Sequence, residues 1–191
     1  IAGLESLSAE RIGQETRKLL MAPDPTFAVA GLRNSGVLQL ILPGADDRWL
    51  GPLVHCETAL GLDPDWLRRL AVMGGEGVEP KLRLSKSEAR AYALSRDVGF
   101  GALPLAEIAY RHGQNVAQTA HLIRAVMAEQ MPAAGALGQI AKAACACFPI
   151  KAADLIPQFQ GPALGKKLAE LEQLWINSEF ALEKSELLNH G

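Results

Sequence analysis

The chain has 191 residues and a formal net charge of −2, so it is long enough to bury a sizeable core, in one domain or two tightly joined ones. This balance excludes a protein whose whole surface attracts nucleic acid, and a nucleic-acid partner would need local patches of cations. Aromatic residues make up only 5% of the chain, while alanine and leucine are abundant, which favours helices over sheets.

Hydropathy and cysteine content restrict the class of protein further. The longest apolar runs are far shorter than a membrane-spanning helix, and no signal-peptide pattern opens the chain. The three cysteines, Cys56, Cys145 and Cys147, are odd in number and form no CxxC pair, which favours a reducing, cytoplasmic setting. Because the chain begins at Ile1 rather than at a methionine, we expect it to be part of a longer protein.

The first predicted helix begins after Ser8, a suitable N-cap, and Glu10 places a carboxylate in the first turn, where the helix dipole favours it. Apolar side chains recur on one face of this helix. Arg11 and Glu15, four residues apart, are neighbours on another face. Taken by themselves, these charged residues are typical of a solvated helix face.

Short helices joined by short loops are predicted next, at about residues 25–35, 47–60 and 64–73. The apolar run at residues 37–42 stands alone among helices, and we assign it as helical too. Asp63 and Asp65 have the DxD spacing with which polymerases hold two metal ions. However, Pro64 lies between them and a helix follows, so capping is the better interpretation.

The glycine-rich stretch at residues 74–84 is the clearest break in the chain. We place a boundary there, between a neck-like helical region at residues 1–75 and a body and tail helical region at residues 76–191. Ser85 and Glu88 form a capping box that opens a helix to about residue 97. Residues 81–96 hold five basic side chains and one acid, a composition that suits a solvated helix face as well as an RNA-binding surface.

The second half of the chain is also predicted to be helical. We expect a short helix that ends at Gly113, a longer one capped by Asn115, a third at residues 133–148 with Cys145 and Cys147 on different sides, and a terminal one capped by Ser178. The whole pattern predicts an all-α fold of about ten helices in an elongated array.

An amphipathic helix is predicted after Pro162, which suits a first helical position. Its apolar stripe consists of Leu164, Leu168, Leu171 and Trp175. Glycines let a phosphate approach the unpaired N–H groups of a helix start, so Gly161, Gly165, Lys166 and Lys167 are candidates for a phosphate-binding site. The alternative is that the glycines serve a turn and a close helix crossing, and that the lysines are solvated.

Familiar catalytic and metal-binding motifs do not occur in the sequence. It contains no Gly-rich loop after a strand, no GxSxG, no HExxH and no zinc pattern. We therefore assign no catalytic residue and no metal ligand, and the residues alone are typical of a helical binding or scaffold module.

Residues 7–43, LSAERIGQETRKLLMAPDPTFAVAGLRNSGVLQLILP, follow the pattern of an LSxERIxxELxKLL helix, a second helix and a GvL run that ends in Pro-Glu. The matching residues are Leu7, Ser8, Glu10, Arg11, Ile12, Glu15, Lys18, Leu19, Leu20, Gly36, Val37, Leu38 and Pro43. This run resembles the segment that follows the catalytic head in class II tRNA nucleotidyltransferases, the bacterial CCA-adding enzymes and their poly(A) polymerase relatives. Thr16 stands where leucine is usual, and Gly44 where glutamate is usual.

A second stretch is similar to the DL…GxxxGxxLxxLexxW run of the alphaproteobacterial members of that family. The residues that fit it are Asp154, Leu155, Gly161, Gly165, Leu168, Leu171 and Trp175. With the YRHG motif at residues 110–113 between them, the resemblance spans nearly the whole chain.

The resemblance implies an all-α neck, body and tail that holds tRNA, or another RNA 3′ end, by shape and backbone. It implies that Glu10, Arg11 and Glu15 belong to a helix that supports the nucleotide-selecting helix. Mg²⁺ with ATP or CTP is expected in a catalytic head that this chain lacks. The sequence leaves open whether the full enzyme adds CCA, only C or A, or poly(A). The alternative function is a free-standing helical protein-interaction module.

Overall fold

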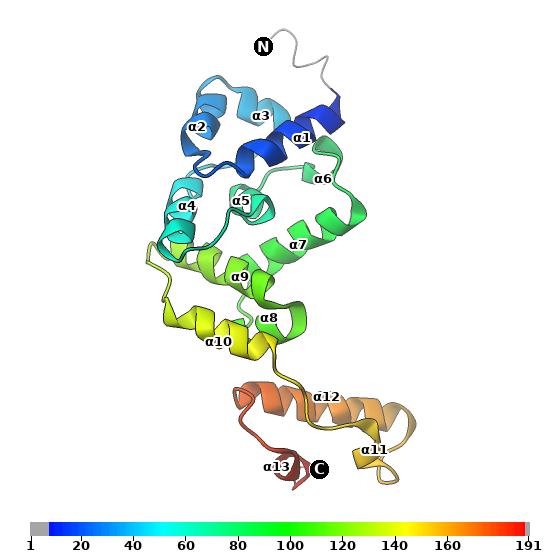
Figure 1. Cartoon of the computed structure of the whole chain (residues 1–191). Helices are drawn as coiled ribbons and strands as arrows, with labels where there is room; N and C mark the ends of the chain where they lie inside the picture. The colour runs from blue at the N-terminus through cyan, green and yellow to red at the C-terminus, as the bar shows by residue number, and fades with distance from the viewer. Residues whose placement is uncertain (1–7, 190–191) are drawn as a thin grey trace. The chain divides into compact units, whose positions relative to one another are not determined.

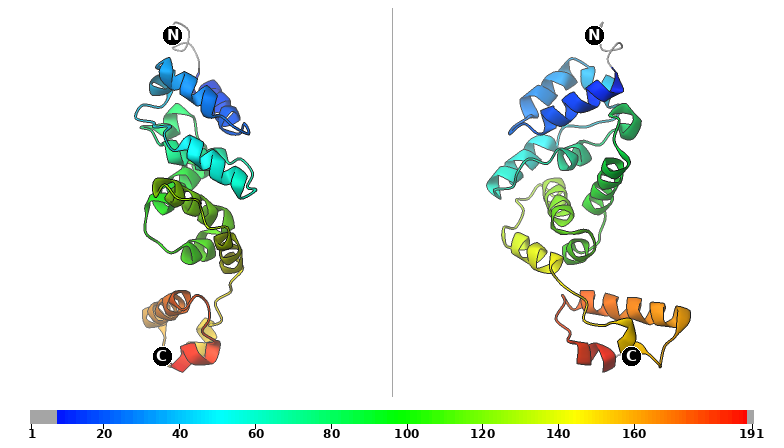
Figure 2. Two further views of the ribbon diagram at one scale, coloured as in Figure 1. Left: turned by 90° about the vertical axis from the view of Figure 1, so that its left-hand side faces the viewer. Right: turned by 45° about the vertical axis from the view of Figure 1, so that its right-hand side comes forward.

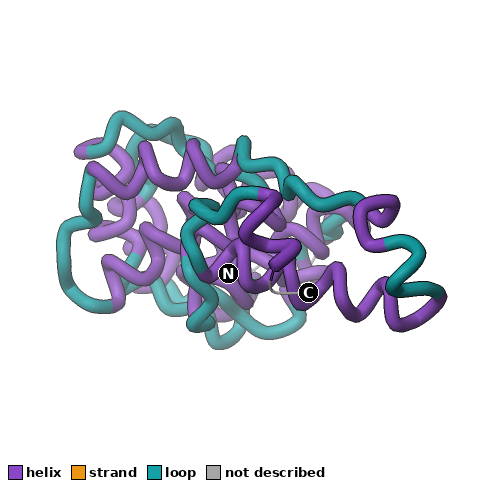
Figure 3. The backbone as a smooth tube through the Cα atoms, turned by 90° about the horizontal axis from the view of Figure 1, so that it is seen from below, coloured by secondary structure: helices purple, strands orange, loops and turns teal. Residues whose placement is uncertain are grey.

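The computed structural model describes residues 8–189, where every regular element is an α-helix (Figures 1 and 3). The helices in this range are α1 (Ala9–Leu20), α2 (Thr26–Asn34), α3 (Val37–Ile41), α4 (Leu50–Ala59), α5 (Trp66–Met73), α6 (Val78–Lys81), α7 (Lys86–Phe100), α8 (Leu105–His112), α9 (Gln114–Met127), α10 (Gly135–Ala144), α11 (Ala152–Leu155), α12 (Gly161–Asn177) and α13 (Lys184–Asn189). The all-α prediction is confirmed. Leu7, the first residue of the matched motif, lies outside the described residues.

The chain divides into two compact units, and each is assembled from distant parts of the sequence. The first comprises Ile1–Ala102 and Gln118–Ala134, and the second comprises Leu103–Ala117 and Gly135–Gly191. The division expected at residue 75, between neck and body, stays a prediction.

The first unit has a core of aliphatic side chains from α1–α7 and the later part of α9. Its least exposed members include Leu20, Val29, Leu38, Leu42, Leu50, Leu53, Leu70, Leu82, Leu122 and Ile123. Each side chain of this size contributes roughly 1.5–3 kcal/mol when fully buried, so the core is the main stabilising feature of the unit.

The second unit has its own core around Trp175 on α12. The Trp175 ring lies 5.5 Å from Tyr110 of α8 and 4.8 Å from Phe180, both edge to face, and 5.5 Å from Phe148. Leu171 and Trp175 are buried, with Leu164 and Leu168 partly buried, which confirms the predicted stripe of α12.

Three helix starts with local capping signals were predicted correctly, those of α1, α5 and α7. Ser8 caps α1, and Ser85 and Glu88 form the complete capping box of α7. Asp65 of the DxD pair accepts hydrogen bonds from the amides of Leu67 (2.8 Å) and Arg68 (3.2 Å) at the start of α5, so the capping interpretation is confirmed.

Three predicted helix ends were wrong. Helix α9 already begins at Gln114, so Asn115 lies inside it. Helix α10 ends at Ala144, and Cys145 and Cys147 are exposed beyond its end, where the chain turns and brings Phe148 to Trp175. Ser178 ends α12, because Glu179 (φ 56°) and Phe180 (φ 64°) turn the chain so that Phe180 also packs on Trp175.

Membrane insertion has no candidate segment in this fold: every helix of residues 8–189 is too short or too polar to cross a bilayer.

Candidate nucleic-acid interface

Helix α1 is held to the first unit through its own backbone. The Ser8 hydroxyl accepts a hydrogen bond from the Arg11 amide (3.3 Å). One turn later, Gly13 lies against the end of α6, where an added Cβ would be 2.1 Å from the Leu82 carbonyl oxygen. Only glycine allows this approach, so a side chain at position 13 would push α1 away from α6.

Two ion pairs connect α1 to α7 and to the loop that precedes α7. The Arg17 guanidinium donates to both carboxylate oxygens of Glu88 (3.1 and 3.2 Å) and lies 5.0 Å from the centre of the Trp66 ring. Glu10 pairs with Arg83 (2.9 Å). The pKa of Glu10 is lowered by a hydrogen bond from its own backbone amide and by the nearby Arg83 guanidinium. The predicted site residue Glu10 therefore binds Arg83 of a distant loop.

The loop between α1 and α2 is fixed from inside the protein by a buried charge cluster. Arg69 donates hydrogen bonds to the carbonyl oxygens of Leu20 (2.7 Å), Ala22 and Pro23 (3.2 Å) and to Glu57 (2.9 Å). Arg68 pairs with the other oxygen of Glu57 (2.9 Å). All three charged side chains are at most 5% exposed, so this network sets where α2 begins relative to α1.

Sequence reasoning missed this cluster, although a signal was present. Arg68 and Arg69 are adjacent in α5, an otherwise largely apolar helix. Adjacent helical positions point in different directions, so at least one arginine had to approach the core and needed a buried partner.

Helices α1, α2 and α3 enclose a groove of about 300 Å³. These three helices lie together in both views of Figure 2. The groove is lined by Arg11, Ile12, Glu15, Thr16, Leu19, Leu32, Val37 and Ile41. The structure thus brings two of the predicted residues, Arg11 and Glu15, to one groove and leaves Glu10 with Arg83.

The chemistry of the groove is mostly apolar. One guanidinium and one carboxylate lie among aliphatic walls, and their opposite charges give the groove no net attraction for a phosphate. Such a surface suits an apolar side chain or a stacked ring, with the two charged groups orienting polar atoms at its edge.

The second predicted site lies at the start of α12, in the other unit. Gly161 begins the helix with φ 57°, and Lys166 is exposed (81%), with its amine 3.9 Å from Glu170. The Lys167 side chain is only 16% exposed, 4.0 Å from Glu170 and 5.9 Å from the centre of the Phe159 ring. Both lysines lie in the second turn, beyond the first-turn amides, so the dipole penalty expected for them is small.

The role of Gly161, Gly165, Lys166 and Lys167 in phosphate binding stays a prediction. Within residues 8–189, no atom beyond the adjoining residues and the helix's own backbone lies within 4 Å of a Cβ built on Gly161 or Gly165, so neither glycine serves the close helix crossing that was the alternative.

A metal centre does not fit the part of the chain described by the structure. Across residues 8–189, no three His, Cys, Asp or Glu side chains come together closely enough to hold an ion.

The helical fold and the groove of α1–α3 define a binding region, and comparison with known families indicates its class. Residues 2–48 match the family model described as "Probable RNA and SrmB-binding site of polymerase A". The chain therefore carries a poly(A) polymerase-like RNA-binding region, which includes α1, α2, α3 and all residues of the groove. Comparisons with curated proteins and with solved structures give no match.

Proposed function

We propose that this chain is the tRNA-binding C-terminal part of a CCA-adding tRNA nucleotidyltransferase or a poly(A) polymerase, acting in the cytoplasm. In this proposal it positions the RNA 3′ end for a catalytic head that holds Mg²⁺ and ATP or CTP. The observation that carries the proposal is that residues 2–48, which contain α1, α2 and α3, match the model of an RNA-binding region.

The groove has the composition needed to support a neighbouring helix of the head. Its aliphatic walls would bury apolar side chains, and Arg11 and Glu15 at its edge would orient polar ones. The Gly13 contact and the buried Arg69 cluster keep α1 and the following loop in place, so the support would be rigid. Loss of Arg11 should therefore affect nucleotide selection or turnover in the full enzyme more than folding.

A protein-interaction module is the second candidate function, and two observations favour it. The groove is mostly apolar, and Phe27 on α2 is 92% exposed. The name of the matched family also includes a protein partner, SrmB, beside RNA.

Equilibrium binding of fluorescently labelled tRNA to the full chain tests the proposal. We expect binding whose log K falls linearly with log salt concentration, since phosphate contacts release counterions. Unlabelled tRNA should compete better than a blunt RNA duplex of equal length. If the folded chain fails to bind tRNA even at low salt, the RNA function is wrong and the protein-interaction module is favoured.

The gene provides an independent check. Codons for a GGxVRD loop and a carboxylate pair directly before Ile1 would support the proposal, whereas a start codon beside Ile1 would contradict it.

A further inference from the structure

We infer that the RNA-binding surface extends beyond the matched residues 2–48 onto the outer face of α7, where Lys86 and Arg90 contact RNA phosphates; this inference rests on the proposed RNA function. The two residues lie well outside the matched segment, and only the fold brings them near it.

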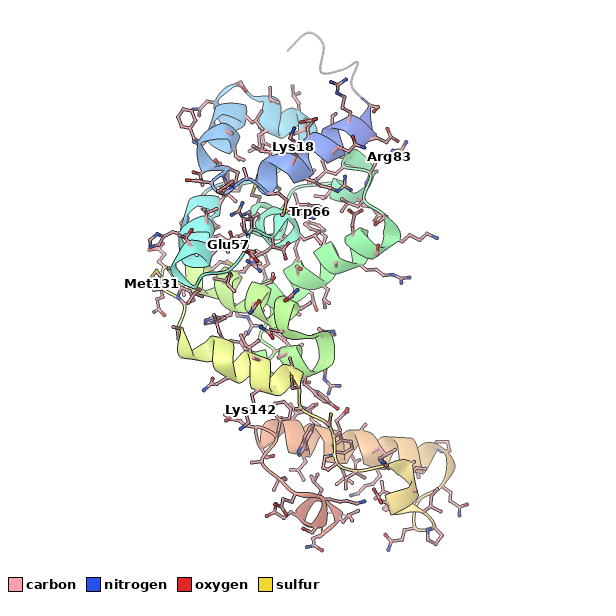
Figure 4. All side chains as sticks on the ribbon, viewed as in Figure 1. Lys18, Glu57, Trp66, Arg83, Met131 and Lys142 are labelled. Atoms are coloured by element: carbon pink, nitrogen blue, oxygen red, sulfur yellow. The ribbon has the colours of Figure 1, made fainter. Side chains whose placement is uncertain are left out.

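The first observation is that side-chain contacts join α1 to α7 and to the loop before α7. The Arg17–Glu88 pair joins residues 71 positions apart in sequence, and Glu10–Arg83 adds a second connection. The close approach of Gly13 to the Leu82 carbonyl oxygen leaves no gap between α1 and the segment before α7. RNA held along α1 therefore passes close to the start of α7, as Figure 4 shows for Arg83 beside α1.

The second observation is the charge balance of residues 81–96, which contain five bases and one acid. The acid, Glu88, is already used by Arg17 and by the Ser85 amide. Arg96 donates to the Ala71 carbonyl oxygen (2.7 Å) and lies over the Phe100 ring.

Of the other cations in this segment, Arg83 pairs with Glu10 and Lys81 is half-buried, which leaves Lys86 and Arg90 available. Both are exposed, and within residues 8–189 neither has a carboxylate oxygen within 4 Å. Apart from Glu88, the nearest acids in sequence are Glu79 and Asp97, just outside the two ends of the segment. A polyanion would therefore meet two positive charges without having to displace a carboxylate.

The geometry of α7 suits a phosphate backbone. Residues four apart on a helix are neighbours on one face, separated by about 6 Å along the axis. Val98 and Ser95 on the same helix are buried, so α7 is fixed by its inner side while Lys86 and Arg90 lie on the outer side. Two like charges held this closely repel each other, and binding along one strand of RNA would relieve the repulsion.

The test is a salt titration of tRNA binding by the double variant Lys86→Gln/Arg90→Gln. Glutamine keeps the helix propensity of both positions, so folding should be preserved, as circular dichroism would verify. We expect the slope of log K against log salt to shrink by about 1.4–1.8, since each phosphate contact contributes about 0.7–0.9.

The matched control is Arg111→Gln/Lys184→Gln, which removes the same charge from the second unit, outside the matched residues 2–48. Arg111 pairs with Glu107 (2.8 Å) and Lys184 with Asp154 (2.6 Å), so these cations are already neutralised and their loss should change the slope less. An equal loss of slope in both doubles, or no loss in the first, overturns the inference. Displacement of tRNA by poly-glutamate at matched charge would assign the surface to acidic protein instead. If the wild-type chain does not bind tRNA, the proposed function fails, which is a different result.

Discussion

Arg69, which is only 1% exposed, joins the carbonyl oxygen of Leu20 at the end of α1 and those of Ala22 and Pro23 in the following loop to a carboxylate on α4. A buried guanidinium without a counter-charge is costly, so Glu57 is required by both Arg68 and Arg69. The position of the groove therefore depends on one carboxylate that does not line it.

Glu57→Gln should destabilise the protein by about 3–5 kcal/mol, because it leaves two buried guanidinium groups without their negative partner. Urea denaturation followed by circular dichroism measures this change. The control Glu79→Gln removes an exposed carboxylate and should stay within about 0.5 kcal/mol of the wild type. A loss below 1 kcal/mol for Glu57→Gln would contradict the role given to the cluster.

Prediction of single residues from the sequence identified three helix caps correctly, but it failed for the caps Asn115 and Ser178 and for the partners of charged side chains. Ser8, Asp65 and Ser85 act on amides two or three residues away, so their patterns were sufficient. Glu10 was grouped with Arg11 and Glu15 because one helix carries all three. Its actual partner, Arg83, is remote in sequence, and no local pattern identifies it.

At the scale of elements, α12 shows what the spacing of apolar residues can predict and what it cannot. The stripe ending in Trp175 was predicted from spacing, and burial follows it. Periodicity could not separate Lys166 from Lys167, since the difference comes from Phe159, which precedes the helix and covers only one of them.

The phosphate-binding prediction for α12 can now be tested one lysine at a time. If the helix start binds RNA phosphate, Lys166→Gln should lower the salt slope of tRNA binding by up to about 0.7–0.9 and leave stability unchanged, because the side chain is exposed. It should weaken binding to all tRNAs alike, because phosphate contacts carry no sequence information. Lys167→Gln should in addition lower the unfolding midpoint, since it removes the contact with Phe159. An unaltered slope for Lys166→Gln would show that this lysine is only solvated.

Helix ends were predicted poorly where tertiary packing decides them. Helix α10 ends at Ala144, short of the predicted residue 148, and α12 ends at Asn177. In both places the chain turns so that an aromatic side chain, Phe148 or Phe180, reaches Trp175, and burial of these rings outweighs the extension of a helix.

At the scale of the whole molecule, composition predicted the all-α class, whereas the two compact units follow from packing. The glycine-rich stretch at residues 74–84 is the strongest break in the sequence, yet it lies within the first unit. Residues 118–134 follow α8 in the sequence but belong to the first unit, because Leu122 and Ile123 complete its core. Such a return of the chain depends on three-dimensional packing, which linear patterns do not record.

The central claim is that RNA binds the first unit along α1–α3 and α7. Cross-linking of tRNA that contains 4-thiouridine, followed by peptide mapping, tests it most directly. We expect cross-linked peptides from residues 8–48 and from residues 81–96, with the second group lost in Lys86→Gln/Arg90→Gln. Cross-links confined to residues 135–189, from a chain that binds tRNA, would contradict the account.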